Sequence, residues 1–365
     1  MRYIDAQAIE DIAAGAAVLG TGGGGDPYIG KMMALQAIEK YGPIPLMTVD
    51  ELDDDALVVP SSMIGAPTVM VEKIPAEGMV TQALEFIEQA LGKKVAVTMP
   101  IEVGGVNSII PLVVAAEKGI PVLDADAMGR AFPEAQMVTF YLDGLAPAPT
   151  AMTDERGNGI VMYPVDGVMS ERFARSVTIQ MGGSAAMCDY PLSGKQVKQS
   201  AIPGTLTLAQ EIGALLRTAR SQETSPVRML LDKLGGFELF AGKTVDISRR
   251  TDSGFTKGQA TFDGIDHDRG RQMILGFQNE HLVALENGQP LATTPDLLAV
   301  LDKETGMPIT TEGLKYGARV SIVAFPCHAK WRTAKGIETV GPRYFGYDFD
   351  YVPVEQLVAK RGEKA

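Results

Sequence analysis

Apolar positions in the first 165 residues alternate between helical spacing and short continuous runs. Residues three and four apart are apolar, as expected for one buried helix face, in four segments: 4–19, 28–41, 77–91 and 107–118. Short apolar runs between some of them predict strands over 57–60, 95–98 and 121–124, the first ending in a turn over 61–67. Strand–helix–strand order at this pitch indicates a parallel sheet with right-handed crossovers. We therefore predict a three-layer parallel α/β domain over residues 1–165.

The pattern changes near residue 150. Turn-forming residues cluster over 148–150 and 154–159, and the second cluster is typical of a hairpin tip. Helical spacing returns over 166–179, 205–220 and 227–234. After residue 242 we expect almost only short strands, over 243–248, 258–262, 272–277, 281–285, 297–301 and 319–325. Residues 166–365 are thus predicted to form a β-rich, barrel-like domain with a helical segment around 205–235.

A glycine-rich run follows the first predicted helix: Gly20-Thr21-Gly22-Gly23-Gly24-Gly25-Asp26-Pro27. Asp26 is a suitable N-cap and Pro27 a suitable first residue for the next helix. The run therefore joins helix to helix, whereas a dinucleotide-binding fingerprint follows a strand, and it lacks the Lys-Ser/Thr of a P-loop. Its backbone amides suit an anionic or carbonyl oxygen, so the candidate ligand-binding residues are Thr21, Gly22, Gly23, Gly24, Gly25 and Asp26. A tight connection without a ligand is the alternative.

Polar residues also follow two predicted strands, where open α/β sheets bind their ligands. Glu102, Gly104, Gly105 and Asn107 come after the strand over 95–98. Asp124 ends the strand over 121–124, directly after Val122-Leu123, and Asp126 and Arg130 follow it. The carboxylates could hold a hard cation or act as general base, and the arginine could clamp a carbonyl or carboxylate. Alternatively, they are helix caps and ion pairs that hold two loops together.

Composition and charge narrow the class of protein. A formal net charge of −12 with no basic stripe argues against a nucleic-acid partner. No apolar stretch approaches about 18 residues and no apolar leader opens the chain, so we expect a cytoplasmic protein without a membrane span. Two cysteines and three histidines without CxxC or HxxxH spacing argue against a zinc site. Cys188 is expected to be a buried structural residue.

Taken together, these motifs resemble the S-methyl-thiohydantoin desulfurase-like family, formerly called domain of unknown function 917. The likeness covers nearly the whole chain and rests on residues 19–27, 102–107, 124–134, 296–302, 316–317 and 341–348. The resemblance implies an N-terminal three-layer α/β domain and a β-rich C-terminal domain. It also implies a functional link to hydantoinase and oxoprolinase relatives, near which members are often encoded.

From the residues and the resemblance we expect an enzyme that acts on a small cyclic amide or thioamide by hydrolysis or desulfurisation. The Gly22–Gly25 and Gly104-Gly105 amides would bind the carbonyl or thiocarbonyl, and Arg130 would orient the substrate. Glu102, Asp124 or Asp126 would be the general base, with or without a divalent metal ion. We also expect a homo-oligomer. The alternatives are a non-catalytic ligand-binding subunit or sensor of a hydantoinase/oxoprolinase-type system, and a nucleotide-dependent enzyme, which a strand directly before Gly20 would favour.

Overall fold

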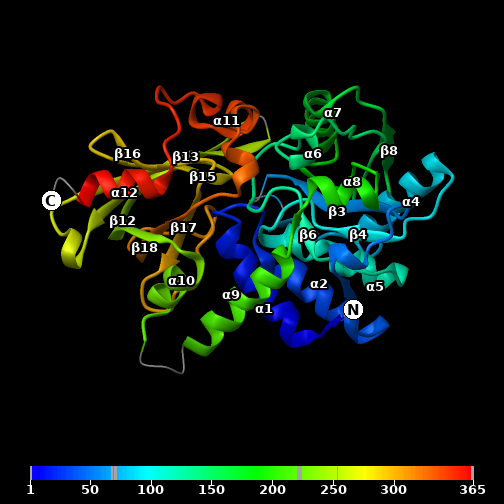
Figure 1. Ribbon diagram of the computed structural model, residues 1–365, viewed down its shortest axis with the longest axis horizontal. Coiled ribbons are helices and arrows are strands. Elements are labelled where there is room, and N and C mark those ends of the chain that lie inside the picture. Colours follow the sequence, from blue (N-terminus) through cyan, green and yellow to red (C-terminus); the bar gives the residue numbers. More distant parts are fainter. Residues whose placement is uncertain (1, 67–68, 70–71, 220–223, 253, 363–365) are drawn as a thin grey trace.

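The computed structural model describes residues 2–66, 69, 72–219, 224–252 and 254–362. Figure 1 shows an α/β half on the right and a β-rich half on the left, so the predicted fold class is confirmed. The strands of the main α/β sheet are β1 (Arg2–Ile4), β2 (Ile44–Met47), β3 (Leu57–Gly65), β4 (Val97–Met99), β5 (Val122–Leu123), β7 (Thr150–Thr153), β8 (Gly159–Met162), β9 (Ser184–Cys188) and β10 (Leu192–Ser193). A separate two-stranded ladder joins β6 (Ala125–Asp126) to β11 (Ile202–Pro203).

The main sheet has the strand order β1-β2-β5-β4-β3-β9-β7-β8, with β10 paired beside β3. The strands β2, β5, β4 and β3 are parallel, as predicted for this half of the chain. The other ladders are antiparallel, so the complete sheet is mixed. The segment after β5 contacts the β-rich half through Arg130, which donates to Pro295 O and Asp296 O, so this edge of the sheet lies beside that half and positions the site.

Helices cover both faces of this sheet, with α7 on the opposite side from α2 and α5 (Figure 1). The helices of this half are α1 (Ala6–Leu19), α2 (Pro27–Tyr41), α4 (Met79–Leu91), α5 (Ile110–Lys118), α6 (Thr139–Leu142), α7 (Gly167–Gln180), α8 (Gly194–Ser200) and α9 (Thr205–Ala219). The next helix, α10 (Pro226–Leu234), lies on the side of the β-rich half (Figure 1). As predicted, α1 and α2 begin at the N-caps Asp5 and Asp26, whose carboxylates accept from Ala8 N and Tyr28 N at 2.8 Å.

The α1 and α9 helices are in close contact because each has a glycine at the crossing. A Cβ on Gly15 would lie 1.9 Å from Ala209 O, and one on Gly213 would lie 1.9 Å from Asp11 O. Asp11 also accepts two hydrogen bonds from Arg217, at 2.8 and 2.9 Å. This packing secures α1, which carries the glycine-rich run at its C-terminal end.

Two predictions in this half were wrong in detail. The segment over 61–67 was expected to turn, but β3 continues to Gly65 and changes partner on the way, from β4 to β9. Ser61 and Ser62 are buried there because their hydroxyls are hydrogen-bonded, to Thr98 Oγ1 and Met187 O. The helix expected over 107–118 is interrupted: a 3₁₀ turn, η2 (Gly105–Ser108), precedes α5.

The β-rich half is a curled antiparallel sheet of seven strands in the order β16-β15-β14-β13-β12-β18-β17. Two features differ from the predicted short strands: β12 has 16 residues, and β16 lies in a segment that was not predicted as a strand. The strands are β12 (Phe237–Asp252), β13 (Phe255–Gly264), β14 (Gln272–Gln278), β15 (Glu280–Glu286), β16 (Gln289–Thr293), β17 (Leu297–Asp302) and β18 (Arg319–Phe325). The later helices are α11 (Ala334–Val340) and α12 (Val354–Gly362), and the remaining 3₁₀ turns are η1 (Val49–Glu51), η3 (Asp266–Asp268), η4 (Ala329–Arg332) and η5 (Pro342–Phe345).

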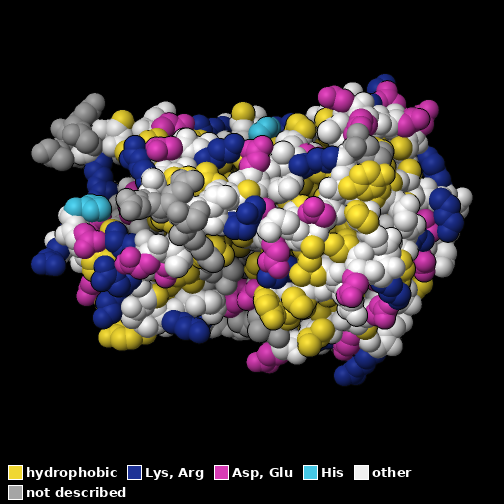
Figure 2. All heavy atoms as spheres, turned by 90° about the horizontal axis from the view of Figure 1, so that it is seen from below, with side chains coloured by type: hydrophobic (Ala, Val, Ile, Leu, Met, Phe, Trp, Pro, Cys, Tyr) yellow, Lys and Arg dark blue, Asp and Glu magenta, His cyan; other side chains and the backbone are white. Residues whose placement is uncertain are grey.

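One hydrophobic cluster spans the two halves, and each half also has buried clusters of its own. Ile9 and Ile12 of α1 belong to the same buried cluster as Leu297 of β17, Phe325 of β18 and Trp331. On the face shown in Figure 2, acidic and basic side chains are interspersed, and hydrophobic side chains gather on the α/β half. No helix in the described part of the chain is both long and apolar enough to cross a membrane.

Candidate functional site

A cavity of about 640 Å³, part of it open to solvent, lies where the two halves meet. Its walls come from the glycine-rich run, the end of β3, the loop after β4, the segment over 132–135, α7, β9 and the start of β15. The polar or charged residues that line it are Ser62, Glu102, Asn107, Glu134, Arg175, Asp189, Asn279 and Glu280, together with Gly24 and Gly25. Its position between two halves of the fold and its mixture of apolar and polar lining residues are typical of a small-molecule site.

Glu102 lies in this cavity, as the position after β4 predicted. Asn107 holds the carboxyl group: its Nδ2 donates to Glu102 Oε1 at 2.6 Å and to Met63 O at 3.1 Å, while its Oδ1 accepts from Met63 N at 2.8 Å. Burial, with a smaller contribution from nearby Asp126, raises the pKa of Glu102 to about 8. The Asn107 amide and the charge of Arg130 act in the opposite direction. Glu102 therefore holds its proton at neutral pH.

Asp189 is a second acid of the cavity, which sequence reasoning missed. It directly follows the buried strand β9 and is 2% exposed. Burial raises the pKa of Asp189 to about 7, so the group is divided between its charged and neutral forms near neutrality. The available signal was a carboxylate directly after the apolar run Ala185–Cys188, the same rule that selected Asp124.

Asp124 and Asp126 are not among the described residues that line the cavity. Asp124 caps the start of α9, accepting from Thr207 N at 3.0 Å and from the Thr207 hydroxyl. Asp126 Oδ2 accepts from the backbone N–H groups of Val103, Met128 and Gly129 at 2.7, 3.1 and 2.7 Å. These contacts agree with the alternative prediction that the two aspartates cap a helix and hold loops together. Of the three predicted carboxylates, only Glu102 is among the described residues that line the cavity.

The glycine-rich run lies between the two halves and contacts both. Thr21 O accepts from His281 N and Gly22 O accepts from Thr311 N, both at 2.8 Å. A Cβ on Gly23 would lie 1.9 Å from Glu280 Oε1. The absence of side chains thus allows close packing against β15, and the run joins helix to helix as predicted.

Two of its glycines, Gly24 and Gly25, line the cavity. Gly24 N donates to Glu280 Oε1 at 3.2 Å, and Gly24 O accepts from Val106 N at 2.8 Å. Gly105 has a φ of +36°, and a Cβ there would lie 1.8 Å from Gly25 O. Gly104 is also close to the run, since a Cβ on Gly24 would lie 2.6 Å from its carbonyl carbon. Asp26 is exposed and caps α2.

Arg130 is completely buried beside the cavity and holds the two halves together. Its five N–H groups meet five oxygen acceptors: Thr21 Oγ1 and the backbone carbonyls of Ala131, His281, Pro295 and Asp296. Burial lowers the pKa of Arg130 to about 10. The centre of the Phe132 ring also lies 4.5 Å from the Arg130 guanidinium carbon. Since its N–H groups have partners within the chain, these contacts indicate that Arg130 has a structural role.

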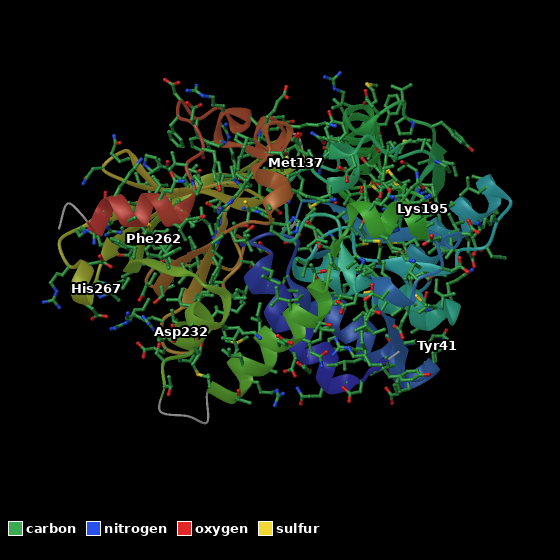
Figure 3. All side chains as sticks on the ribbon, in the orientation of Figure 1. Tyr41, Met137, Lys195, Asp232, Phe262 and His267 are labelled. Carbon is green, nitrogen blue, oxygen red and sulfur yellow. The ribbon has the colours of Figure 1, made fainter. Side chains whose placement is uncertain are left out.

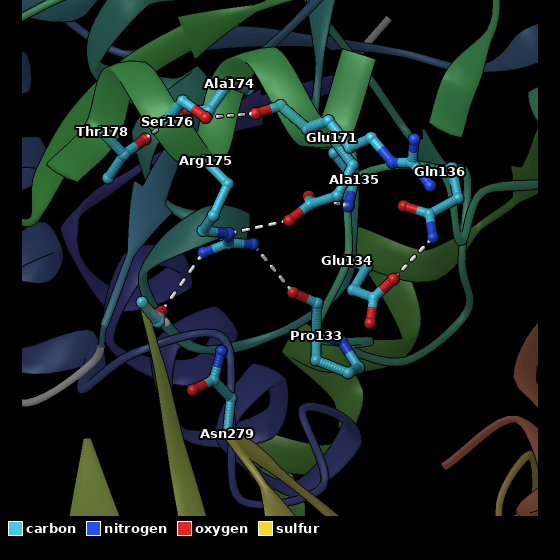
Figure 4. A network of polar contacts seen from close by, with 12 residues as sticks. Pro133, Glu134, Ala135, Gln136, Glu171, Ala174, Arg175, Ser176, Thr178 and Asn279 are labelled. Carbon is cyan, nitrogen blue, oxygen red and sulfur yellow. Dashed lines mark hydrogen bonds and ion pairs between the residues drawn. The ribbon is translucent and has the colours of Figure 1, made fainter. Parts of the chain in front are cut away.

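Arg175 of α7 forms part of the rim, and Figure 4 shows its contacts. Its Nε donates to Glu171 at 2.7 Å, its Nη2 to Pro133 O at 3.1 Å, and its Nη1 to Gly254 O at 3.3 Å. The last bond reaches the turn between β12 and β13, so this arginine also connects the two halves. Sequence reasoning did not identify it.

The described residues contain no group of three or more His, Cys, Asp and Glu side chains arranged to hold a metal ion. The histidines are dispersed: His267 lies at the outer end of the β-rich half (Figure 3), whereas His281 is buried against the glycine-rich run. Burial lowers the pKa of His281 to about 4, so its ring is neutral. Cys188 is buried, and burial raises the pKa of its thiol to about 12. This agrees with a structural cysteine.

Comparison with known proteins gives a match for each part of the chain, with a boundary at 164–165 that lies before α7 and β9 of the α/β half. Residues 7–164 match the family described as S-Me-THD-like, N-terminal domain, and residues 165–354 match S-Me-THD-like, C-terminal domain. A crystal structure of a protein from Chromobacterium violaceum is similar with a TM-score of 0.83 and 23% identity, over 97% of this chain and 100% of that one. At this identity the likeness shows a common fold. No curated protein matches the chain significantly.

Proposed function

This chain belongs to the S-Me-THD-like family, and from that premise we propose that it is an enzyme acting on a small cyclic amide or thioamide in the cavity between its halves. The resemblance recognised in the sequence motifs is the same family. The proposed substrate is a ring of the hydantoin or thiohydantoin type, and the proposed reaction is hydrolysis or desulfurisation.

One observation carries the proposal: two carboxyl groups with raised pKa values line the same buried cavity. Glu102, with a pKa of about 8, holds a proton at neutral pH, and Asp189, with a pKa of about 7, can accept one. Proton transfer is fastest when donor and acceptor have pKa values near the working pH. Two acids with different environments can therefore take the roles of general acid and general base.

The roles follow from these protonation states. The Asp189 carboxylate takes a proton from water as the water oxygen bonds to the ring carbon that carries the leaving group. The Glu102 carboxyl gives its proton to the departing ring nitrogen or sulfur as the bond to that carbon breaks. Asp189 then holds the proton that came from water and Glu102 is ionised, and proton exchange with solvent restores both groups. Asn107 keeps the Glu102 carboxyl in position through its 2.6 Å hydrogen bond.

The test is turnover by Glu102→Gln and by a matched control, Asp124→Asn, which changes a buried carboxylate outside the cavity. Hydantoin, 2-thiohydantoin and S-methyl-2-thiohydantoin are supplied, and ring opening and thiol release are measured. Loss of a general acid lowers kcat by roughly 10²- to 10⁴-fold, whereas the control should stay within about 2-fold per folded molecule. Binding without turnover by the unchanged chain would favour the sensor alternative. Full activity of Glu102→Gln would exclude the role given to Glu102.

A further inference from the structure

Glu280 brings a further carboxyl group into the cavity, and it comes from the β-rich half. It is the first residue of β15 and is 3% exposed. Its Oε1 accepts from Gly24 N at 3.2 Å, whereas its Oε2 is buried without a hydrogen-bond partner among the described residues. A buried polar atom without a partner costs free energy, so a residue lining a cavity in this state indicates a ligand that completes it.

The groups around Glu280 keep its carboxyl uncharged. Burial is the main cause that raises its pKa well above the usual range, and Glu102 acts in the same direction when it is ionised. The charge of Arg130, the Gly24 N–H and the backbone N–H of Glu280 itself act in the opposite direction. The neighbouring His281 ring is neutral. Since Oε1 accepts the Gly24 N–H, the proton of the neutral acid belongs on Oε2, the atom without a partner.

The cavity offers no free positive charge to an anion. Among the described residues that line it, Arg175 is the only cationic side chain. Its Nε, Nη1 and Nη2 already donate to Glu171, Gly254 O and Pro133 O. A carboxylate ligand would therefore meet several acidic side chains and a single cation that is already paired with Glu171, which is unfavourable in a buried site.

A neutral carboxylic acid matches one edge of a cyclic amide. The acid presents an O–H donor beside an oxygen acceptor, and a cis-amide in a ring presents a C=O acceptor beside an N–H donor, so the two form a pair of parallel hydrogen bonds. We propose that Glu280 recognises this cis-amide edge, Oε2–H donating to the ring carbonyl and Oε1 accepting from the ring N–H. The cavity then selects uncharged rings over their ring-opened carboxylates. This assignment rests on the proposed function for the choice of ring.

The experiment measures binding, so that it is independent of turnover. Titration calorimetry at pH 7 uses 2-imidazolidinone, which has a cis-amide edge and no leaving group, and N-carbamoylglycine, the open-chain acid of hydantoin. The unchanged chain should bind the ring at least about 10-fold more tightly than the acid. Glu280→Gln, whose amide also has a donor beside an acceptor, should bind the ring within about 3-fold of the unchanged chain. Glu280→Met, similar in size but without either group, should bind it roughly 10- to 100-fold more weakly.

Equal affinity for ring and acid, or equal affinity of the Met and Gln variants for the ring, would overturn the assignment. If Glu280→Met does not fold, the ratio of the affinities for the ring and for the open-chain acid, measured with the unchanged chain and with Glu280→Gln, still tests the assignment. Failure of the unchanged chain to bind the ring would also overturn the assignment. The two proposals fail differently. Ring binding with the expected preference but no turnover of any hydantoin would reject the enzyme and leave Glu280 in its role. Turnover that is insensitive to Glu280 would reject only this inference.

Discussion

Replacing Asp126 by alanine should destabilise the fold strongly, because this carboxylate holds two loops together. Its Oδ2 accepts three backbone N–H groups, from Val103, Met128 and Gly129, and the residue is completely buried. Each N–H left without a partner costs about 1–3 kcal/mol, which would total several kcal/mol if the loops did not move. Part of this is recovered because burial, which raises the pKa of Asp126 to about 7, already makes its charged form unfavourable. We expect a net loss of about 3–5 kcal/mol.

The assay is urea unfolding at pH 7, followed by circular dichroism, with Asp126→Asn as the matched variant. Asparagine keeps an oxygen that can accept all three N–H groups, so its loss should be about 1 kcal/mol or less. Activity per folded Asp126→Asn molecule should stay within about 5-fold, since Asp126 is not among the described residues of the cavity. An alanine variant that loses less than about 1 kcal/mol would refute the loop-holding role. An asparagine variant of normal stability that loses all turnover would return Asp126 to the reaction.

Two further predictions concern the backbone and pH. Gly105→Ala should destabilise the protein by more than about 2 kcal/mol, because its Cβ would lie 1.8 Å from Gly25 O at a φ of +36°. The control Gly92→Ala, at a φ of +62° with open space around it, should cost only about 1 kcal/mol. Equal losses of stability in the thermal melts of the two variants would contradict the close approach of Gly105 to Gly25. The free energy of unfolding should fall as the pH rises from 6.5 to 8, because Glu102 and Asp189 have raised pKa values in the folded protein. The stabilisation from their bound protons is complete below the ordinary carboxyl pKa and is lost once the pH has risen through about 7 to 8. Each proton that the folded state retains and the unfolded state has lost lowers the free energy of unfolding by about 1.4 kcal/mol per pH unit. Urea midpoints that stay constant or rise over this pH range would argue against the raised pKa values.

Local signals in the sequence were sufficient for the elements that border the cavity. Asp26 and Pro27 marked the start of α2, and the position of Glu102 after an apolar run placed it at the edge of the sheet. These predictions succeeded because caps and strand ends depend on residues near one another in the chain. Ser61 and Ser62 misled for the same reason, since the hydrogen bonds that allow them to lie in a buried strand come from Thr98 and Met187.

The remaining site residues depend on packing between distant segments. Glu280 contacts Gly24 across 256 positions, and no local pattern connects them. The glycine-rich run was recognised as a place of close approach, but its neighbour was expected to be a ligand. The structure places His281, Glu280 and Gly104 against it, so part of the glycine content is explained by the chain's own side chains and backbone.

The change of partner along β3 has a consequence for the order in which the chain can fold. Pairing of Ser61 with Cys188 means that the second half of β3 waits for a segment synthesised 127 residues later. Until then its backbone N–H and C=O groups form an open edge, and open edges invite pairing with other chains. The family boundary at 164–165 precedes β9, so a fragment ending there would keep this edge permanently. Nascent or truncated chains are therefore expected to aggregate through β3. The edge of β3 is protected only after β9 has left the ribosome and paired with it.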